Sequence, residues 1–334
     1  MTTNELNRQF SRILASENTD FEKIRLLVTI GISEPIAAQI VENRANTRAR
    51  VLQAARAAAA AQMAETNTEN NAPTLAEVFL QNFENYTFGI ELECFAARQR
   101  LIESGHESGA QIMSDSYNHN DRHDGVFKLV TDASVEGLPN AVECVSSVLP
   151  ANADGFGLVR NVCNALAGAG ARINKTCGFH VHIGAEQMTD FQYISVFVNY
   201  MYLQPIIDKF MPLSRVDSQW ARNMSRHAAA LESCTTKAAV YPALNFSRYW
   251  AVNPHAYSRH KTVEFRQHNG TVEYEKIYNW LMFLLQLCEF SKENRYTRET
   301  RPLSLENLTW LAAEQKTYYK QRTEHFENAR VAAA

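Results

Sequence analysis

The feature that most constrains this chain is a strand-like alternation of apolar and acidic residues near its first quarter. In FGIELECF, which begins at Phe88, Ile90 and Leu92 alternate with Glu91 and Glu93. Successive side chains of a strand point to opposite faces, so one face of this strand is apolar and the other carries two carboxylates. A surface strand facing water would explain this pattern, and so would an acidic pocket that holds metal ions.

Three later segments repeat the alternation: TDASVEGLPNAVECVSSVLP, CGFHVHIG and HKTVEFRQHNG. In the first of them, Asp132 ends one strand and Glu143 lies within the next. The side chains that the other two segments place on one face are His180, His182, Thr262, Glu264, Arg266 and His268. Each segment alone fits an ordinary surface strand. Their joint occurrence predicts one concave sheet with an acidic inner face and an outer face that packs against helices.

Such an inner face either titrates or binds cations, because clustered carboxylates raise one another's pKa and destabilise the fold. Removing one of them is therefore expected to leave the stability of the metal-free protein unchanged or to raise it. The donors are rich in oxygen and include no inward-facing cysteine, which favours Mg²⁺ or Mn²⁺ over a tetrahedral zinc site. Mg²⁺ is usually held by a few carboxylates and substrate phosphates, and the planar fork of Arg266 suits a phosphate.

The first 66 or so residues have helix-period apolar patterns throughout, and the polar segment TNTENNAPT follows them. We therefore expect a helical N-terminal region over residues 1–70 and a second domain over 71–334. The helical region is either a subdomain packed on the second domain or an arm for self-association or a protein partner.

The predicted strands of the second domain are 86–96, 125–131, 140–148, 176–184, 246–253 and 260–268. The predicted helices are 154–170, 189–211, 276–292 and 304–328. These elements show no regular alternation of strand and helix, which favours an α+β fold with a largely antiparallel sheet.

The net charge and the cysteine content limit the kinds of partner and the cellular compartment that the sequence predicts. A net charge of −3 gives no general attraction to nucleic acid or to an anionic membrane surface. The six cysteines form no CxxC pair, and with no signal peptide they predict reduced thiols in a cytoplasmic protein. The apolar run WLMFLL, residues 280–285, is too short to span a bilayer.

The order of GIELE, TDASVEGLPNAVECVSSVLP, CGFHVHIG and TVEFRQHNGT resembles the amidoligase family, which belongs with glutamine synthetase and glutamate–cysteine ligase among carboxylate–amine ligases. The resemblance covers about residues 86–290 and leaves out the N-terminal helices. It implies a curved, funnel-like antiparallel sheet. It also implies an ATP-dependent ligase that joins a small-molecule or peptide carboxylate to an amine through an acyl phosphate.

The resemblance also implies roles for individual residues. The implied ligands of Mg²⁺ or Mn²⁺ are Glu91, Glu93, Glu143, His180 and Glu264, with His182 as a further ligand or a supporting contact. The implied catalytic residues are Arg266, which would contact the transferred phosphoryl group, Asp132 and Arg215. The residues implied to bind ATP are Arg266, Arg248, Tyr249 and Asn253. The chain has DAS at Asp132 where the family often has DGS.

Two other functions remain open at the level of the sequence. A metal-dependent hydrolase also uses an HxH strand and carboxylates, although these strands hold more carboxylates than one zinc ion needs. A non-catalytic binding or structural protein could keep the same fold. Release of ADP from Mg²⁺-ATP would distinguish the ligase from both.

A chain that begins at Pro73 is expected to fold and to bind Mg²⁺-ATP, because residues 1–70 contain no residue of the metal or phosphate motifs. We expect it to differ from the full chain in oligomeric state or in use of its natural substrate. Nucleotide affinity and solution mass measure the two effects. An insoluble chain, or one that no longer binds nucleotide, would show that the helices belong to the catalytic core.

Overall fold

The structure is a computed structural model that describes residues 20–29, 83–115, 124–131, 135–137 and 139–333. The chain divides into two compact units, residues 1–73 and 74–334. In the first unit the structure describes one helix, α2 (Asp20–Thr29), in agreement with the helical pattern there. The other helices predicted over residues 1–70 lie outside the described residues, so the role of this region stays a prediction.

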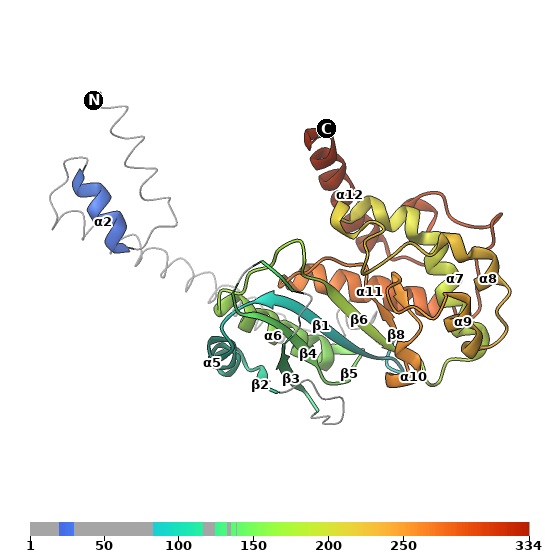
Figure 1. The fold of residues 1–334 in the computed structure, drawn as a ribbon, viewed down its shortest axis with the longest axis horizontal. Coiled ribbons are helices and arrows are strands. Elements are labelled where there is room, and N and C mark those ends of the chain that lie inside the picture. The colour runs from blue at the N-terminus through green and yellow to red at the C-terminus, as the bar shows by residue number, and fades with distance from the viewer. Residues whose placement is uncertain (1–19, 30–82, 116–123, 132–134, 138, 334) are drawn as a thin grey trace, which may run out of the picture. The chain divides into compact units, whose positions relative to one another are not determined.

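The second unit is built on one eight-stranded sheet in the order β2-β3-β4-β1-β6-β8-β7, with β5 beside β1 (Figure 1). The strands are β1 (Thr87–Phe95), β2 (Gln111–Ser114), β3 (Val126–Val130), β4 (Ala141–Ser146), β5 (Leu149–Pro150), β6 (Phe179–Gly184), β7 (Val252–Asn253) and β8 (Thr262–Phe265). Within the described residues the pair β2–β3 is parallel and the other pairs are antiparallel. The predicted α+β class with a largely antiparallel sheet is confirmed.

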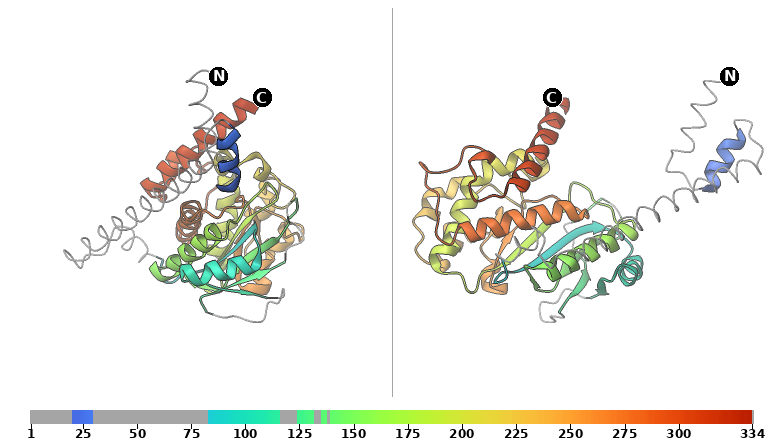
Figure 2. Two further views of the ribbon diagram at one scale, coloured as in Figure 1. Left: turned by 90° about the vertical axis from the view of Figure 1, so that its left-hand side faces the viewer. Right: turned by 180° about the vertical axis from the view of Figure 1, so that it is seen from behind.

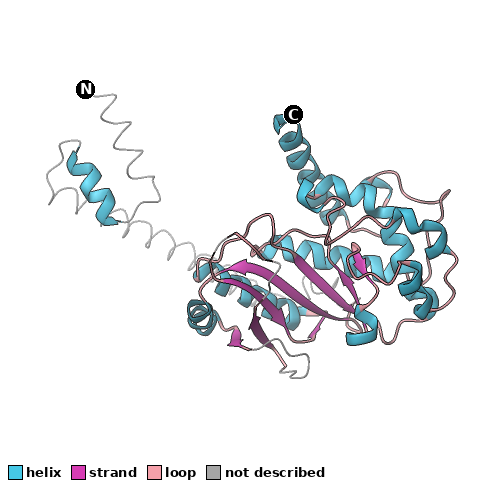
Figure 3. Cartoon of the chain, viewed as in Figure 1, coloured by secondary structure: helices cyan, strands magenta, loops and turns pink. Residues whose placement is uncertain are grey.

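Helices cover one face of the sheet and its ends (Figure 3). They are α5 (Arg98–Ser108), α6 (Ala153–Gly168), α7 (Asp190–Ile207), α8 (Ala228–Glu232), α9 (Lys237–Ala243), α10 (Ala256–His260), α11 (Tyr274–Phe290) and α12 (Ala313–Ala333). The view from behind shows α6 and α11 lying across the sheet (Figure 2). The opposite face, which carries the acidic positions, is left uncovered by these long helices.

The alternation in the strands explains which face the helices cover. Ile90, Leu92 and Val181 belong to the outer face and are buried in the main apolar core. Ring contacts join the strands to the helices, as between Phe265 and Tyr200 of α7, whose centroids lie 5.5 Å apart. Burying such side chains is the main force that holds the sheet and the helices together. The acidic face therefore stays on the other side by default.

Local sequence signals fix where the core helices begin. The Asn152 side chain accepts hydrogen bonds from the first amides of α6. Thr189 and Gln192 form a capping box at the start of α7, in which each side chain accepts from the other residue's backbone amide. Both caps satisfy amides that a helix cannot pair internally. The interior of α7 is buried nearly all round, as its continuous apolar sequence predicts.

Two predicted strands are much shorter than expected. The prediction 246–253 is reduced to β7, because Asn245 and Phe246 have positive φ angles of 54° and 53° that turn the chain before it reaches the sheet. The prediction 260–268 is reduced to β8, because its first residues end α10 with Lys261 in a left-handed conformation. In both cases local turns override a strand-like residue pattern.

Other differences concern helices and a sheet edge. The prediction 304–328 contains a short 3₁₀ turn at Leu305–Asn307, and the long helix α12 begins only at Ala313. The residue pattern did not predict α5 or the edge strand β2. The helix α5 carries few apolar residues, which leaves its helix period weak in the sequence.

All six cysteines are free and buried, in agreement with the prediction of reduced thiols. Their side chains lie within the apolar clusters of the protein. None of the helices in the described part of the chain is long and apolar enough to cross a membrane.

Phe283 of α11 is fully buried and has ring contacts with Trp280, Phe210, Trp310 and Tyr319, so it joins α11 to the C-terminal part of the unit. Replacing it by alanine is expected to lower the free energy of unfolding by about 3–5 kcal/mol, through lost burial and the cavity left behind.

Urea unfolding measures this change, with Leu303→Ala as the control because Leu303 is 75% exposed. We expect the control to change stability by less than about 0.5 kcal/mol. Similar losses in both variants would contradict the assignment of Phe283 to a shared core.

Candidate functional site

The register of the sheet brings acidic and imidazole side chains from different strands into neighbouring positions. Glu91 of β1 lies opposite His180 of β6, and Glu93 of β1 lies opposite Glu143 of β4. On the other side, His182 of β6 pairs with Glu264 of β8. Since paired residues in adjacent strands share a face, the sheet collects on its inner side the metal-type residues that the alternation predicted.

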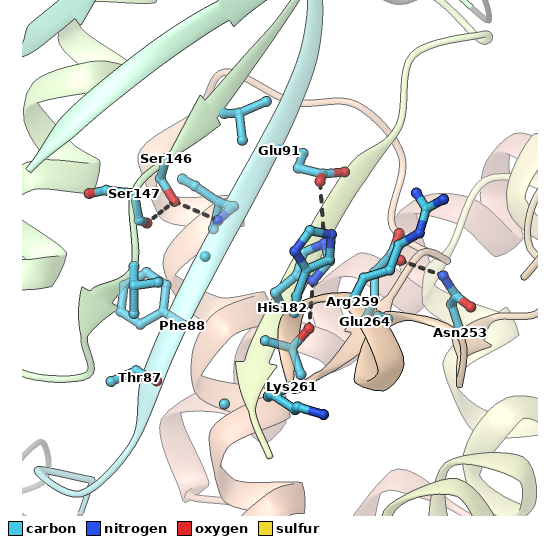
Figure 4. A pocket seen from close by; sticks show the side chains of 18 of the residues that line it. Thr87, Phe88, Glu91, Ser146, Ser147, His182, Asn253, Arg259, Lys261 and Glu264 are labelled. Carbon is cyan, nitrogen blue, oxygen red and sulfur yellow. Dashed lines mark hydrogen bonds and ion pairs between the residues drawn. The ribbon is translucent and has the colours of Figure 1, made fainter. Parts of the chain in front are cut away.

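The first group of metal-type donors consists of Glu91, His182 and Glu264, and we call it the first triad. One ligand atom from each residue lies within 4.8 Å of the others. The Nε2 atom of His182 is 3.3 Å from a carboxylate oxygen of Glu91 (Figure 4). The Nδ1 atom of His182 is 2.9 Å from the Thr262 hydroxyl, which fixes the orientation of the ring.

The second group, which we call the second triad, consists of Glu91, Glu143 and His180, with ligand atoms again within 4.8 Å of one another. The Nδ1 atom of His180 is 3.0 Å from Glu91, so Glu91 belongs to both triads. Glu93 lies just beyond, with an oxygen 3.7 Å from Nε2 of His180. Its other oxygen accepts a hydrogen bond of 2.5 Å from the Gly178 amide.

Electrostatics keeps Glu91 ionised although its side chain is only 25% exposed. Burial raises the pKa of its carboxyl, but hydrogen bonds and charge from His180 and His182 outweigh this effect and hold the pKa well below its ordinary value. Burial likewise lowers the pKa of His182, but Glu91 and Glu264 raise it above its ordinary value overall. The site therefore presents ionised oxygen donors beside imidazoles that compete with a cation for them.

The donors of the two triads fit a divalent cation. Together they offer three carboxylates and two imidazoles and no thiolate, a set that suits Mg²⁺ or Mn²⁺ and that could also hold other imidazole-binding metals. The shared position of Glu91 would allow its two oxygens to serve neighbouring cations.

Arg266 is anchored beside the first triad. Its Nη1 atom donates to Glu264, and its Nε atom donates to the Trp220 carbonyl at 3.3 Å. The other oxygen of Glu264 accepts a hydrogen bond of 2.6 Å from Asn253. Burial raises the pKa of the Glu264 carboxyl, but the charges of Arg266 and His182 lower it below its ordinary value overall. Glu264 is thus held ionised between a guanidinium and an amide.

Arg215 is buried and lies close to Glu93. Its Nη2 atom donates to the Cys177 carbonyl. A Cβ atom added to Gly178 would lie 2.8 Å from Nε2 of His180 and 2.9 Å from Nη2 of Arg215. The glycine therefore allows Arg215 and the second triad to approach the same point of the backbone.

A cavity of about 410 Å³ opens over the inner face. Among the predicted site residues it is lined by Glu91, Glu143, His182, Arg248, Asn253, Glu264 and Arg266. Tyr249 is not among its lining residues; its ring contacts Trp220, with centroids 5.3 Å apart. Glu93, His180 and Arg215 lie deeper and do not line the cavity. Asp132 lies outside the described residues.

His268 is not on the inner face, which corrects the prediction that it shares a face with Glu264. Its ring packs against Phe179 and Trp280, with centroids 5.4 Å away in each case, on the side of the sheet that the helices cover. The strand ends at Phe265, so the alternation no longer sets the direction of later side chains. Burial lowers the pKa of His268 to about 3, so the ring is neutral.

Several residues that line the cavity were not predicted from the sequence. Lys128 occupies an inner position of VFKLV, and the same period-two reading would have found it. Arg259 and Lys261 reach the cavity from α10 and the residue after it. Arg259 carries no strand or motif signal, and the predicted strand 260–268 would point Lys261 away from the inner face. Only the fold of the chain brings α10 and Lys261 to the site.

The fold and the site are those of a protein whose largely antiparallel sheet presents carboxylates and imidazoles to a cavity. The sequence profile of a family described as "Putative amidoligase enzyme" matches residues 84–288, which is most of the described second unit. The chain belongs to this family. A comparison with curated proteins finds no match.

Glu264→Ala is expected to destabilise the metal-free protein, contrary to the expectation from charge crowding alone. The structure pairs Glu264 with Arg266, and their side chains are only 7% and 13% exposed. Removing one partner of a buried ion pair leaves the other charge uncompensated, at a cost of about 3–5 kcal/mol.

Urea unfolding in EDTA measures this effect. The control is Glu186→Ala, which removes an exposed carboxylate from the same cavity. Unchanged or higher stability of Glu264→Ala would show that crowding among the carboxylates outweighs the pairing with Arg266.

Proposed function

We propose that the protein is an ATP-dependent carboxylate–amine ligase that works with Mg²⁺ or Mn²⁺. The observation that carries this proposal is the position of Arg266 beside two donor triads that share Glu91. Family membership supports amide formation in general. Carboxylates for divalent cations beside a planar guanidinium form the kind of site that phosphoryl transfer requires.

In this proposal the two triads hold the cations, which would neutralise the negative charge of the phosphates. Arg266 orients the transferred phosphoryl group. Two of its nitrogens are engaged by Glu264 and Trp220, so the plane of its guanidinium is fixed, and its Nη2 atom has no hydrogen bond within the described residues. Asn253 holds Glu264 and so supports this arrangement indirectly.

The chain's residues supply position and charge in this reaction, and no protein nucleophile is required. A carboxylate oxygen of the acid attacks the γ-phosphorus of ATP, and ADP leaves. The amine nitrogen then attacks the acyl carbon, inorganic phosphate leaves, and the nitrogen releases a proton to solvent as the amide forms. Excluding water protects the acyl phosphate in such a reaction, and the cavity walls would contribute to this.

The metal-dependent hydrolase remains the second candidate, because the same carboxylates and imidazoles could activate water on a metal. The position of Arg266 on the cavity favours a phosphate-containing ligand over a neutral amide or ester. Phosphate groups bind arginine through paired hydrogen bonds with a fixed geometry.

Hydroxylamine provides a direct test, because it captures acyl phosphates as hydroxamates. The full chain is incubated with Mg²⁺-ATP, hydroxylamine and a panel of carboxylic acids, amino acids and short peptides. We expect ADP and hydroxamate in equal amounts with one class of acid. Glu143→Gln should abolish both products, whereas Glu186→Gln, in the exposed part of the cavity, should not. Hydrolysis of an ester or amide panel without ADP release would favour the hydrolase.

Arg266→Lys is expected to lower kcat for ADP release by ~100-fold, because lysine keeps the charge but loses the planar fork of donors. Arg100→Lys is the control, since Arg100 is exposed on α5 and does not line the cavity. Rates close to those of the wild type in Arg266→Lys would assign Arg266 a structural role as partner of Glu264.

A further inference from the structure

The cavity has two ends of different chemistry, separated by the first triad. One end, which we call the valine end, lies over β3 and β4 and presents Val126, Val130, Val145 and Val148 together with Lys128 and Glu143, which pair with Val145 and Val130. The other end, which we call the cationic end, is formed by Arg248, His255, Arg259 and Lys261. The proposed function accounts for the triads and Arg266, but it assigns no role to the valine end.

Two observations make the valine end a recess for an apolar group. The only charged side chain of β3 that reaches it, Lys128, forms an ion pair of 2.9 Å with Asp115, so its charge is compensated inside the protein. Val148 is 52% exposed at the edge of the cavity. A ligand that covers an exposed apolar side chain at the rim of a cavity removes apolar surface from water, and this burial favours binding.

Gly89 of β1 forms the floor between the valine end and the first triad. A Cβ atom at this position would meet nothing closer than the Ser146 hydroxyl at 3.7 Å and Cβ of His182 at 3.8 Å, which are ordinary contacts. The φ angle of Gly89 is not positive, so its backbone conformation is open to other residues. Neither the backbone nor the packing therefore requires a glycine here, unlike Gly178 and Gly184, where an added Cβ would come within 2.8 Å and 2.5 Å of a neighbouring side chain.

Because it has no side chain, Gly89 leaves a flat surface between His182 on one side and Ser146 and Ser147 on the other, and Val126 lies beyond Ser147. We propose that the valine end, floored by Gly89, holds the base of the nucleoside triphosphate. This inference rests on the proposed function and adds to it the direction in which the nucleotide lies. Apolar side chains and a flat backbone surface suit an aromatic ring, which gains most from contact over its faces.

The register of the strands supports this orientation of the nucleotide. Gly89 pairs with His182, and His182 pairs with Glu264, so the three residues follow one another across β1, β6 and β8. Adjacent strands are ~4.8 Å apart. A nucleotide whose base lies over Gly89 would therefore carry its phosphates across the first triad toward Arg266.

Transfer of a phosphoryl group also requires the acid to approach from the side opposite to the leaving ADP. With the base at the valine end, the acid arrives from the cationic end, where arginine and lysine attract a carboxylate. The reverse arrangement would place a charged acid against valines and an apolar ring among cations. The charge distribution therefore favours the orientation with the base at the valine end and the acid at the cationic end.

Gly89→Val tests the inference, because valine favours a strand and its branches would occupy the recess above the floor. The affinity of the full chain is measured by calorimetry for Mg²⁺-ATP and for Mg²⁺-tripolyphosphate, which has no base. We expect Gly89→Val to weaken Mg²⁺-ATP binding by ~10-fold or more and to leave Mg²⁺-tripolyphosphate binding within about twofold. Gly89→Ala should give a smaller loss of ATP affinity.

Gly157→Ala is the control, since Gly157 lies on α6 and a Cβ there would contact nothing within 4 Å. Equal ATP affinity in Gly89→Val and wild type would overturn the inference, as would a loss of acid binding with ATP binding intact. Equal losses for ATP and tripolyphosphate would also overturn it, because they would indicate damage to the triads. Failure of the wild type to bind Mg²⁺-ATP at all would instead count against the proposed function.

Discussion

The inner face of the sheet depends on Glu91, a carboxylate held between two imidazoles. It contacts His180 at 3.0 Å and His182 at 3.3 Å, and it belongs to both triads. Its side chain is 25% exposed, and these partners hold its pKa well below the ordinary value, so the carboxyl stays ionised. A carboxylate in this position links β1 to β6 on the polar side of the sheet, while the apolar core links them on the other side.

The charged groups around Glu91 are distributed unevenly, so the two ends of the cavity differ in charge. Arg266 and Asn253 hold Glu264 on one flank, and the Gly178 amide binds Glu93 deeper in the site. The cavity then runs from the valines of β3 and β4, which lie beside Lys128 and Glu143, past the first triad to a group of cations. A ligand with an apolar ring, a chain of phosphates and an anionic neighbour would match this order of surfaces along the cavity.

The limits of the sequence are clearest where a strand pattern continues beyond a strand. His268 follows the period of Glu264 and Arg266, yet its ring lies on the covered side, because the chain leaves the sheet after Phe265. A close contact explains part of this departure: Gly270 passes so near Cys177 that an added Cβ would come within 2.5 Å of the cysteine side chain. Nothing in the local sequence shows that two distant segments meet there.

The sequence by itself determined which side chains share a face within each strand, because the two-residue period of a strand is a local property. Glu91 and Glu93, His180 and His182, and the apolar residues between them could all be assigned in this way. Only the tertiary structure decided which strands are neighbours and in what register, and this pairing made one cluster of Glu91, His182 and Glu264. It also brought Arg259 and Lys261 of the α10 region to the cavity. Such contacts join residues far apart in the chain, and they are fixed by the packing of the whole core.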